Sequence, residues 1–502
     1  MIVVDESTFG SMKSSPRLAL PVASYAVLLV SALQTLVVPV IANIQATLGV
    51  SAGSAAWVVT ANLLAAAVLT PTLGRLGDLH GRRPVMVGVL VVVLVGSVLA
   101  ATTSSLPLLL VARVLQASSF GLFPLSIGVL REELPPRRLT GAMAVVSGML
   151  AVGAGLGLVV TGLLMRHDGD YHRLFWLATA LSVIGLAGVW SLPRRPGAAT
   201  GRLDWTGAGI LGLGLVLLIM PLEEGNTWGW GSARVIGSLA AAIVVLTVFV
   251  LVERRIAQPL VTVRMLTHRP LVVANAAGLF LGFSMFAVFL AVSALVQSPP
   301  AISGYGFGST VLAASLVYLL PGTAGGIVTA PLGGRLVGRF GPKGTLVIAA
   351  LLGLAGFALL AVLHSATWEI IVGATAVNTA VMFGYAALPA LLIAHVTPAE
   401  TGIANSVNSI SRSVGMSLGT AFVVTMLTRN PIAGPVPLPH ESQFVAIFVV
   451  GAALAAAAAA VVWLALPGRP RLELTVLEVE EEAVFGAAGL AAPAELASGQ
   501  PG

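Results

Sequence analysis

Two arginines stand inside long apolar stretches of the chain, where a charged side chain needs an explanation. Arg113 lies in the run VARVLQ, so Gln116, three residues later, would share its face of a helix. Arg412 ends the run NSISR in a second apolar stretch. A guanidinium among apolar residues costs roughly 3 kcal/mol or more unless it faces water or a partner, so each arginine marks a candidate functional site.

Each of these side chains also has a purely structural explanation. Arg113 could bond to backbone carbonyls and hold helices together, and Arg412 could extend along its helix to an aqueous interface. Amides such as Gln34 and Asn62, which also lie in apolar stretches, more often join helices than bind a ligand. The candidates for contact with a ligand or for coupling are Arg113, Gln116, Gln34, Arg412 and Asn62.

The carboxylates and imidazoles are placed differently from these arginines. The 20 acidic residues and the 7 histidines fall in polar loops, in the tails or at the ends of apolar stretches. A cationic ligand inside the apolar region would lack a counter-charge, which favours a neutral or anionic ligand. Proton uptake and release would use an acid at the rim, such as Asp78, Glu132 or Glu133, or the ligand itself.

Several chemistries are excluded or disfavoured by composition. The chain has no cysteine, so disulfides and thiolate metal sites are excluded. The sequence has no glycine-rich phosphate loop followed by Lys and Ser or Thr. The apolar stretches hold no paired carboxylates, metal cluster or Ser/His pair. We therefore expect no enzyme, no metal site and no cofactor, and a proton gradient is the candidate energy source.

Long apolar helices are the elements that must position these residues. Apolar residues make up 57% of the 502 residues and charged residues 9%, against about 25% in ordinary soluble domains. Helices satisfy the backbone hydrogen bonds of such a chain inside a bilayer. The predicted fold is therefore an all-α membrane protein. Its fourteen predicted transmembrane helices lie near residues 19–47, 55–73, 84–103, 106–130, 139–165, 173–192, 204–222, 233–252, 270–297, 309–333, 343–363, 368–394, 401–427 and 442–466.

A polar run between two of these segments occurs twice. The run GRLGDLHGRR at residues 74–83 returns as GRLVGRFGPK at residues 334–343. The copies share their first three residues and a later glycine, and Arg83 keeps its charge as Lys343. Both runs predict tight basic hairpin loops at a membrane face. Two halves with the same loop indicate an internally repeated membrane protein, an arrangement typical of transporters.

These loops are candidates for a conformational gate. Asp78 can lie near the positive start of a neighbouring helix, while Arg82 and Arg83 reach carboxylates or lipid phosphates. Such contacts would set the energy gap between two conformations. The alternative is a basic loop that only fixes orientation. The candidate gate residues are Gly74, Asp78, Gly81, Arg82, Arg83, Gly334, Arg335, Gly341 and Lys343.

Basic residues are distributed unequally between the two sets of loops. With both termini in the cytoplasm, the outer loops hold only Arg166, Arg173, Arg234 and Arg429, which predicts the orientation. The expected parts are a cytoplasmic N-terminal tail at 1–18, a six-helix bundle at 19–192, an inserted two-helix linker at 193–269, a second six-helix bundle at 270–466 and a disordered cytoplasmic tail at 467–502.

The run GRLGDLHGRR resembles the signature between the second and third helices of the major facilitator superfamily. Four later runs are similar to the fourteen-helix drug:proton antiporter branch of that family: LDWTG at 203–207, WGW at 228–230, ERR at 253–255 before QPL at 258–260, and TGIAN at 401–405 before RSVG at 412–415. The resemblance extends from about residue 19 to 466. It implies two six-helix bundles with an inserted pair, alternating access, and export of small, mostly apolar molecules.

Two positions depart from that branch. Its first helix usually carries an acid where this chain has Gln34. Its fifth helix usually carries a Gly-Pro pair, whereas this chain has Gly153, Gly155 and Gly157 without the proline. These glycines would permit close helix approach and a helix bend. The resemblance also implies that Arg113, at the basic position of the fourth helix, acts in coupling or substrate contact.

Together these features predict a secondary active transporter that exports hydrophobic small molecules such as drugs, with proton coupling left open. We expect it in the inner (plasma) membrane of a bacterium as a multi-pass protein. Its expected partners are a small-molecule substrate and membrane lipid, not nucleic acid, and we expect a monomer. Two alternatives stay open: an uptake carrier or facilitator for a neutral or anionic metabolite, and a non-transporting membrane receptor.

Overall fold

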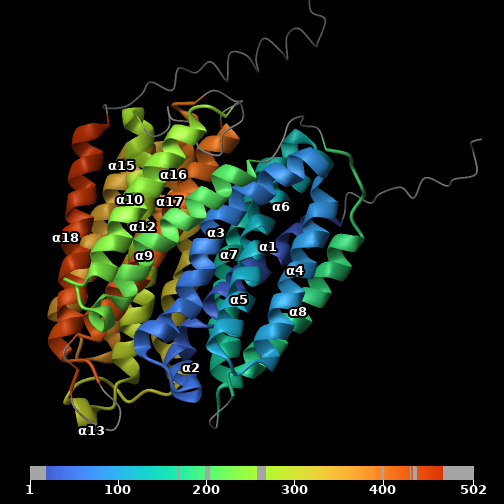
Figure 1. Ribbon diagram of the computed structural model, residues 1–502. Coiled ribbons are helices and arrows are strands. Elements are labelled where there is room, and N and C mark those ends of the chain that lie inside the picture. The colour runs from blue at the N-terminus through green and yellow to red at the C-terminus, as the bar shows by residue number, and fades with distance from the viewer. Residues whose placement is uncertain are drawn as a thin grey trace, which may run out of the picture. The chain divides into compact units, whose positions relative to one another are not determined.

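The N-terminal half is built from long helices (Figure 1). The computed structural model describes residues 18–166, 170–197, 204–256, 267–396, 401–429, 431–432 and 438–466. The helices of this half are α1 (Ala19–Thr35), η2 (Val38–Val40), α2 (Ile41–Leu48), α3 (Ala52–His80), α4 (Arg82–Thr102), α5 (Leu106–Gln116), η3 (Ala117–Gly121), α6 (Leu122–Glu133), α7 (Pro136–Leu164) and α8 (His172–Trp190).

The rest of the described chain continues in the same way. An inserted pair, α9 (Trp205–Trp228) and α10 (Ala233–Glu253), precedes the second half. The helices of the second half are α12 (Arg269–Gln297), α13 (Pro300–Ser303), α14 (Val311–Ala313), η4 (Ala314–Leu319), α15 (Leu320–Val362), α16 (Thr367–Ile393), α17 (Thr401–Leu427) and α18 (Glu441–Ala465). Among the described residues, extended pairing is limited to one isolated bridge, Ile432 with Leu438.

Side-chain caps and glycines set several helix ends. The Ser51 hydroxyl accepts a hydrogen bond from Ser54 N at the start of α3, and Asp204 accepts one from Gly207 N at the start of α9. Such caps satisfy backbone N–H groups that a helix start leaves unpaired. Gly81 separates α3 from α4 with φ of 91°, in the region that favours glycine.

The two repeated runs are shorter turns than predicted. Residues 74–80 belong to α3, so the expected hairpin loop reduces to the single residue Gly81. In the second copy, Gly341 with φ of 72° breaks α15 into helices at 320–340 and 342–362. The connection between the predicted helices at 204–222 and 233–252 is also partly helical, because α9 continues to Trp228. Charged and glycine residues at these helix ends resemble loop composition, which explains the errors.

The two halves repeat one packing scheme. The first helix of each half packs along the fifth, α1 along α7 and α12 along α17. Close backbone approach is visible in both pairs: a Cβ on Gly153 would lie 2.3 Å from Leu28 O, and one on Gly415 would lie 1.9 Å from Leu279 O. The repeat predicted from two short runs therefore extends to whole bundles.

The bundles meet along two seams that are also related by the repeat. The second helix of each bundle packs against the fifth of the other, α3 against α17 and α15 against α7. Further contact occurs where Gln297 Nε2 donates to Pro39 O at 3.4 Å, and where Leu312 lies against Gly162. The inserted helix α9 packs on both α3 and α17, so it covers one of the two seams.

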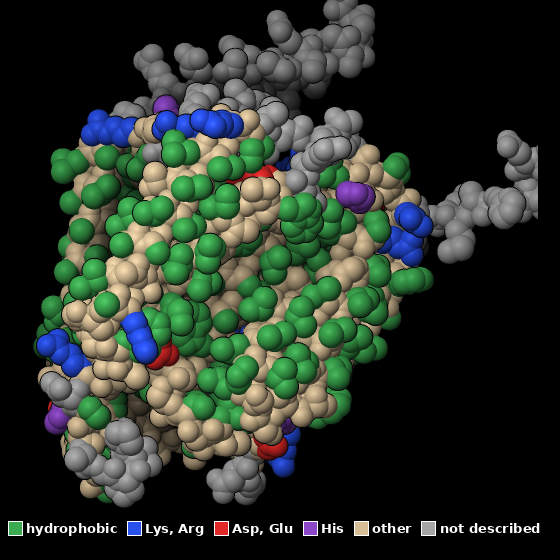
Figure 2. All heavy atoms as spheres, viewed as in Figure 1, with side chains coloured by type: hydrophobic (Ala, Val, Ile, Leu, Met, Phe, Trp, Pro, Cys, Tyr) green, Lys and Arg blue, Asp and Glu red, His purple; other side chains and the backbone are tan. Residues whose placement is uncertain are grey.

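The helices and their surface suit a bilayer. Twelve helices of the described chain are long and apolar enough to cross a membrane, and two shorter apolar helices, Val152–Leu164 and Val311–Gly325, add to them. The number fourteen stays a prediction. In Figure 2 apolar side chains cover the middle of the visible face, while Lys and Arg gather along its upper edge. The described helices belong to one compact unit ending at Leu466. The predicted C-terminal tail and most of the predicted N-terminal tail lie outside the described residues.

Candidate functional site

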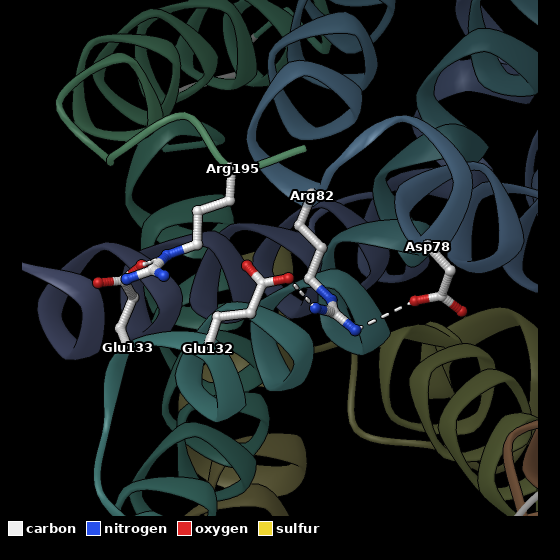
Figure 3. A network of polar contacts seen from close by, with 5 residues as sticks. All are labelled: Asp78, Arg82, Glu132, Glu133 and Arg195. Carbon is white, nitrogen blue, oxygen red and sulfur yellow. Dashed lines mark hydrogen bonds and ion pairs between the residues drawn. The ribbon is translucent and has the colours of Figure 1, made fainter. Parts of the chain in front are cut away.

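Arg82, the first residue of α4, connects this helix to α3 and α6 (Figure 3). Its Nη2 lies 3.1 Å from Asp78 Oδ1 at the end of α3, and its Nη1 pairs with Glu132 Oε1 at the end of α6. Beside it, Arg195 Nε lies 2.6 Å from Glu133 Oε1. This hydrogen bond raises the pKa of Arg195. The structure thus brings together the predicted gate residues Asp78 and Arg82 with the two rim acids.

Glycines leave the space that this cluster occupies. A Cβ on Gly128 of α6 would lie 1.8 Å from Arg82 Nε, and one on Gly81 would lie 2.2 Å from Arg195 O. Arg83 turns to α8, where it donates to Trp190 O at 2.7 Å and lies 5.7 Å from the Trp190 ring centroid. Sequence reasoning missed Gly128 and the Arg195 partnership, since neither carries a local signal.

The cluster ties the end of one bundle together. In the described part of the chain, the partners of Arg82 and Arg83 lie in the N-terminal bundle, and Arg195 lies in the segment that follows α8. These contacts therefore stiffen the ends of α3, α4, α6 and α8 against one another. Their effect on the balance between two conformations stays a prediction.

The second copy of the run has different chemistry. Gly338 and Pro342 stand at the positions of Asp78 and Arg82, so the ion pair cannot form there. Lys343 Nζ instead donates to Leu466 O at 2.6 Å and lies 5.2 Å from the Trp463 ring centroid. Across the residues that the structure places, no carboxylate pairs with Lys343. Gly334 and Arg335 are exposed.

Arg113 is buried in the N-terminal bundle with hydrogen-bond partners. Its side chain is 2% exposed, Nε donates to Val58 O at 2.8 Å, and Nη1 donates to Gln116 Oε1 at 2.8 Å. Gln116 Nε2 in turn donates to Ser97 Oγ at 3.0 Å, and Asn62 Nδ2 donates to Arg113 O at 2.8 Å. The pocket beside Arg113 has no room for a water molecule.

This network brings together three predicted site residues, Arg113, Gln116 and Asn62, of which the sequence had paired only Arg113 and Gln116. It joins α3, α4 and α5, which is what a structural role would require. In this conformation none of the three lines open space. A role in substrate contact or coupling stays a prediction and would require the bundle to open.

Gln34 lies where the two bundles face each other, and Arg412 lies one turn from its partner Met416. Gln34 Nε2 on α1 lies 3.4 Å from Met416 Sδ on α17. Arg412, one turn before Met416, lies 4.9 Å from the centroid of the Tyr385 ring on α16. Tyr385 Oη lies 3.8 Å from Met285 Sδ on α12. The sequence singled out Arg412 but gave no reason to pair it with Tyr385.

The glycines of α7 serve close packing on two sides. A Cβ on Gly157 would lie 2.3 Å from Thr35 Oγ1 of the same bundle. One on Gly155 would lie 3.2 Å from Leu320 Cδ1 of the other bundle. With Gly153 they let α7 contact α1 and α15 at once. The predicted helix bend stays a prediction.

A separate apolar cavity of about 580 Å³ lies in the second half. Helices α12, α17 and α18 wall it, together with Leu222 and Trp230 of the inserted pair. Its polar side chains have partners: Thr425 donates to Leu222 O at 2.6 Å, and Trp230 Nε1 donates to Asn226 Oδ1 at 2.9 Å. Such walls suit hydrocarbon better than a polar ligand. Within the described ranges, no group of three or more His, Asp or Glu could hold a metal ion.

Comparison with known proteins gives consistent matches. The family model described as Major Facilitator Superfamily matches residues 23–420. The tetracenomycin C resistance and export protein of Streptomyces glaucescens is 29% identical over 430 residues, 84% of this chain and 78% of that protein. Multidrug resistance protein 3 of Bacillus subtilis is 27% identical, over 79% of this chain and 76% of that protein.

A solved structure supports the same fold. A mutant of the nucleoside transporter NupG superposes with a TM-score of 0.63 at 14% identity, covering 90% of this chain and 100% of that one. At this identity the match concerns the fold alone. It agrees with the paired bundles derived above from the repeated packing.

Proposed function

The chain belongs to the Major Facilitator Superfamily, and we propose that it is a secondary transporter that exports hydrophobic small molecules across the cell membrane. It is a multi-pass membrane protein with a small-molecule substrate. The observation that carries export is the likeness, over about four fifths of the chain, to named resistance and export proteins. The apolar character of the spans and of the cavity supports a hydrophobic substrate.

The geometry supports alternating access as the mechanism. Two bundles with one packing scheme meet along two equivalent seams, α3 with α17 and α7 with α15. Rocking about such seams would open the central passage first to one side and then to the other. The contacts of Gln297 with Pro39 and of Leu312 with Gly162 would hold one end closed in this conformation.

The charge distribution supports an orientation with the α3–α4 turn in the cytoplasm. This end carries Arg82, Arg83, Arg195 and, in the second copy, Lys343. Cytoplasmic loops carry an excess of Lys and Arg in membrane proteins. Helix η2 and the end of α12, where the bundles meet, would then face outward.

Energy coupling is proposed to involve the cytoplasmic carboxylates if protons drive export. Asp78 and Glu132 share the guanidinium of Arg82, and a proton on either acid would weaken that contact. Export would then depend on the transmembrane proton gradient. The protein would work as a monomer surrounded by lipid.

Accumulation of dyes and antibiotics in cells lacking their main exporters tests this function. Expression of the wild type should lower the steady-state level of hydrophobic compounds, whereas Asp78→Asn should lower it less. An uncoupler should raise the level to that of control cells if protons drive export. A raised level on expression would favour an uptake carrier, and an unchanged level for every compound would favour a receptor.

A further inference from the structure

Arg412 presents a cation near the middle of its helix without a charged partner. It is the twelfth of the 27 residues of α17, Thr401–Leu427. Its guanidinium lies 4.9 Å from the Tyr385 ring centroid. Among the residues that the structure describes, neither a carboxylate nor a hydrogen-bond acceptor pairs with it. A guanidinium has five N–H donors, so this donor capacity is open to a ligand or to water.

Arg113 shows how a buried arginine is satisfied in the same molecule. It is 2% exposed and donates to Val58 O and to Gln116 Oε1. Arg412 is half-buried and has an aromatic face in place of these acceptors. A cation–π contact offsets only part of the cost of a mid-membrane guanidinium. The remainder must come from water or from a bound anion.

Arg412 lies between Gly278 of its own bundle, where an added Cβ would lie 3.3 Å from Arg412 Cγ, and a neighbour on α17 that contacts the other bundle. Asn408 and Met416 lie one turn before and after it, on the same face of α17. Asn408 donates to Ala274 O of α12, whereas Met416 contacts Gln34 of the other bundle. Arg412 therefore lies between Asn408, which bonds within its own bundle, and Met416, which contacts α1 of the other bundle.

The surrounding helices carry almost no negative charge. The sequences of α12 and α17 contain neither Asp nor Glu. The one acid of α16, Glu369, lies in its first turn and accepts hydrogen bonds from Ser365 N and Ala366 N. On α12, α16 and α17, therefore, the positive charge of Arg412 is not offset by a nearby carboxylate.

We propose that Arg412 and Tyr385 form a subsite for planar aromatic anions. The guanidinium fork pairs with a carboxylate or another acidic oxygen of the substrate, and the Tyr385 ring packs against its aromatic body. This proposal rests on the transport function proposed above and narrows its substrates to hydrophobic organic acids. Permanently cationic drugs are excluded from this subsite by the charge of Arg412.

Binding of a matched set of probes tests the subsite without relying on transport. Anthracene carboxylate, methylanthracene and aminomethylanthracene share one ring system and differ in charge at neutral pH. Equilibrium binding to the full-length protein in nanodiscs, corrected for empty nanodiscs, should rank the anion tightest and the cation weakest. We expect the anion to bind about tenfold more tightly than the neutral probe, the equivalent of about 1.4 kcal/mol. Equal affinity for the anion and the neutral probe would overturn the proposal.

Variants assign the preference to the two residues. Arg412→Gln should remove the tenfold preference while leaving the affinity for methylanthracene within about threefold. Tyr385→Phe should behave as wild type, and Tyr385→Leu should weaken both probes, because only the ring is needed. Arg234→Gln removes a charge at the exposed start of α10 and is the matched control, with an unchanged preference.

The outcomes separate the subsite from the transport function. A preference that survives Arg412→Gln would overturn the proposal. If Arg412→Gln does not fold, Arg412→Lys and the wild-type ranking decide, since Lys keeps the charge and should keep a reduced preference. Selective anion binding without flux of the anion in liposomes would contradict the transport function and leave the subsite intact. Flux of neutral compounds, together with equal binding of the anionic and neutral probes, would support the transport function and overturn the subsite.

Discussion

The two copies of the repeated turn share a backbone conformation but differ in how their basic side chain is paired. Both copies change direction at a glycine with positive φ, Gly81 and Gly341. The first then holds Arg82 between two carboxylates, whereas the second holds Lys343 against a carbonyl and a tryptophan ring. The repeat therefore preserves the backbone turn, and a few side-chain positions decide where charge is balanced.

The two arginines inside the spans show the same contrast. Arg113 in the first half is enclosed by acceptors, and Arg412 in the second half faces an aromatic ring. The polar groups of the first half are thus used to hold helices together. In the second half Asn408 also holds helices together, but the guanidinium of Arg412 has no such acceptor among the described residues.

The largest effect is expected for Arg113→Ala. It leaves Val58 O and Gln116 Oε1 without their donor and opens a cavity in the bundle. Loss of about 2–4 kcal/mol of folding free energy is expected from unsatisfied acceptors and lost packing. Thermal unfolding in detergent measures it. Arg412→Ala is the comparison and should lower the melting temperature much less. An equal loss of stability in the two variants would show that the two arginines do not differ in their structural role.

Arg82→Gln should destabilise the first half more than Lys343→Gln destabilises the second. Arg82 neutralises Glu132, which is largely shielded from solvent, so its loss should cost about 1–3 kcal/mol. Lys343, which is half-buried, makes one carbonyl contact and one cation–π contact, and its loss leaves no carboxylate unpaired among the described residues. Thermal unfolding of both variants measures the difference. Adding Glu132→Gln to Arg82→Gln should restore part of the stability, because no unpaired carboxylate then remains.

Alanine at two glycines should act with opposite signs. Gly128→Ala would place a Cβ 1.8 Å from Arg82 Nε and must displace the guanidinium. Gly338→Ala meets no atom within 4 Å in helix α15, so it should be neutral or stabilise by roughly 0.5–1 kcal/mol. Melting temperatures of the two variants provide the measurement. Stabilisation by Gly128→Ala would contradict the packing described around Arg82.

The smallest effect is expected for Asp170, which lies just before α8 at the end of the first bundle opposite Arg82. Burial raises the pKa of Asp170, but hydrogen bonds from His172 and the charges of His172 and Arg173 outweigh it and lower the pKa overall. A carboxyl with a lowered folded pKa stabilises the fold above its unfolded pKa of about 3.9 and loses this effect as the pH falls further. The melting temperature of Asp170→Asn should therefore lie slightly below that of wild type near pH 6 and approach it near pH 3. A constant difference over this range would exclude the ion pair.

Much of the fold follows from the sequence because apolar length alone predicts a spanning helix. Each of the fourteen predicted segments coincides with described helix, and the runs at 74–83 and 334–343 predicted the repeat. The error at 74–80 arose because glycine and charge at the end of α3 have the composition of a loop. In each copy the change of direction needs only one residue, Gly81 in the first and Gly341 in the second.

The site was harder to predict because its partners are distant in sequence. Arg113 and Gln116 were paired correctly by helical spacing, but Val58 O and Ser97 come from other helices. Arg412 and Tyr385 meet only through the packing of α17 and α16. A single sequence shows that a buried cation needs a partner and does not show which one it finds.

Locking the two bundles together at the contact of Gln297 with Pro39 tests alternating access most directly. Because the chain has no cysteine, Pro39→Cys with Gln297→Cys places a unique reactive pair across the bundles. Ser31→Cys with Leu150→Cys, whose positions are linked by a Ser31 Oγ to Leu150 O hydrogen bond of 2.5 Å inside one bundle, is the control. After treatment with a short thiol-specific crosslinker in liposomes, the first pair should lose substrate flux and regain it on cleavage of the linker, while the control pair should keep its flux. Undiminished flux through the protein crosslinked between its bundles would contradict the account.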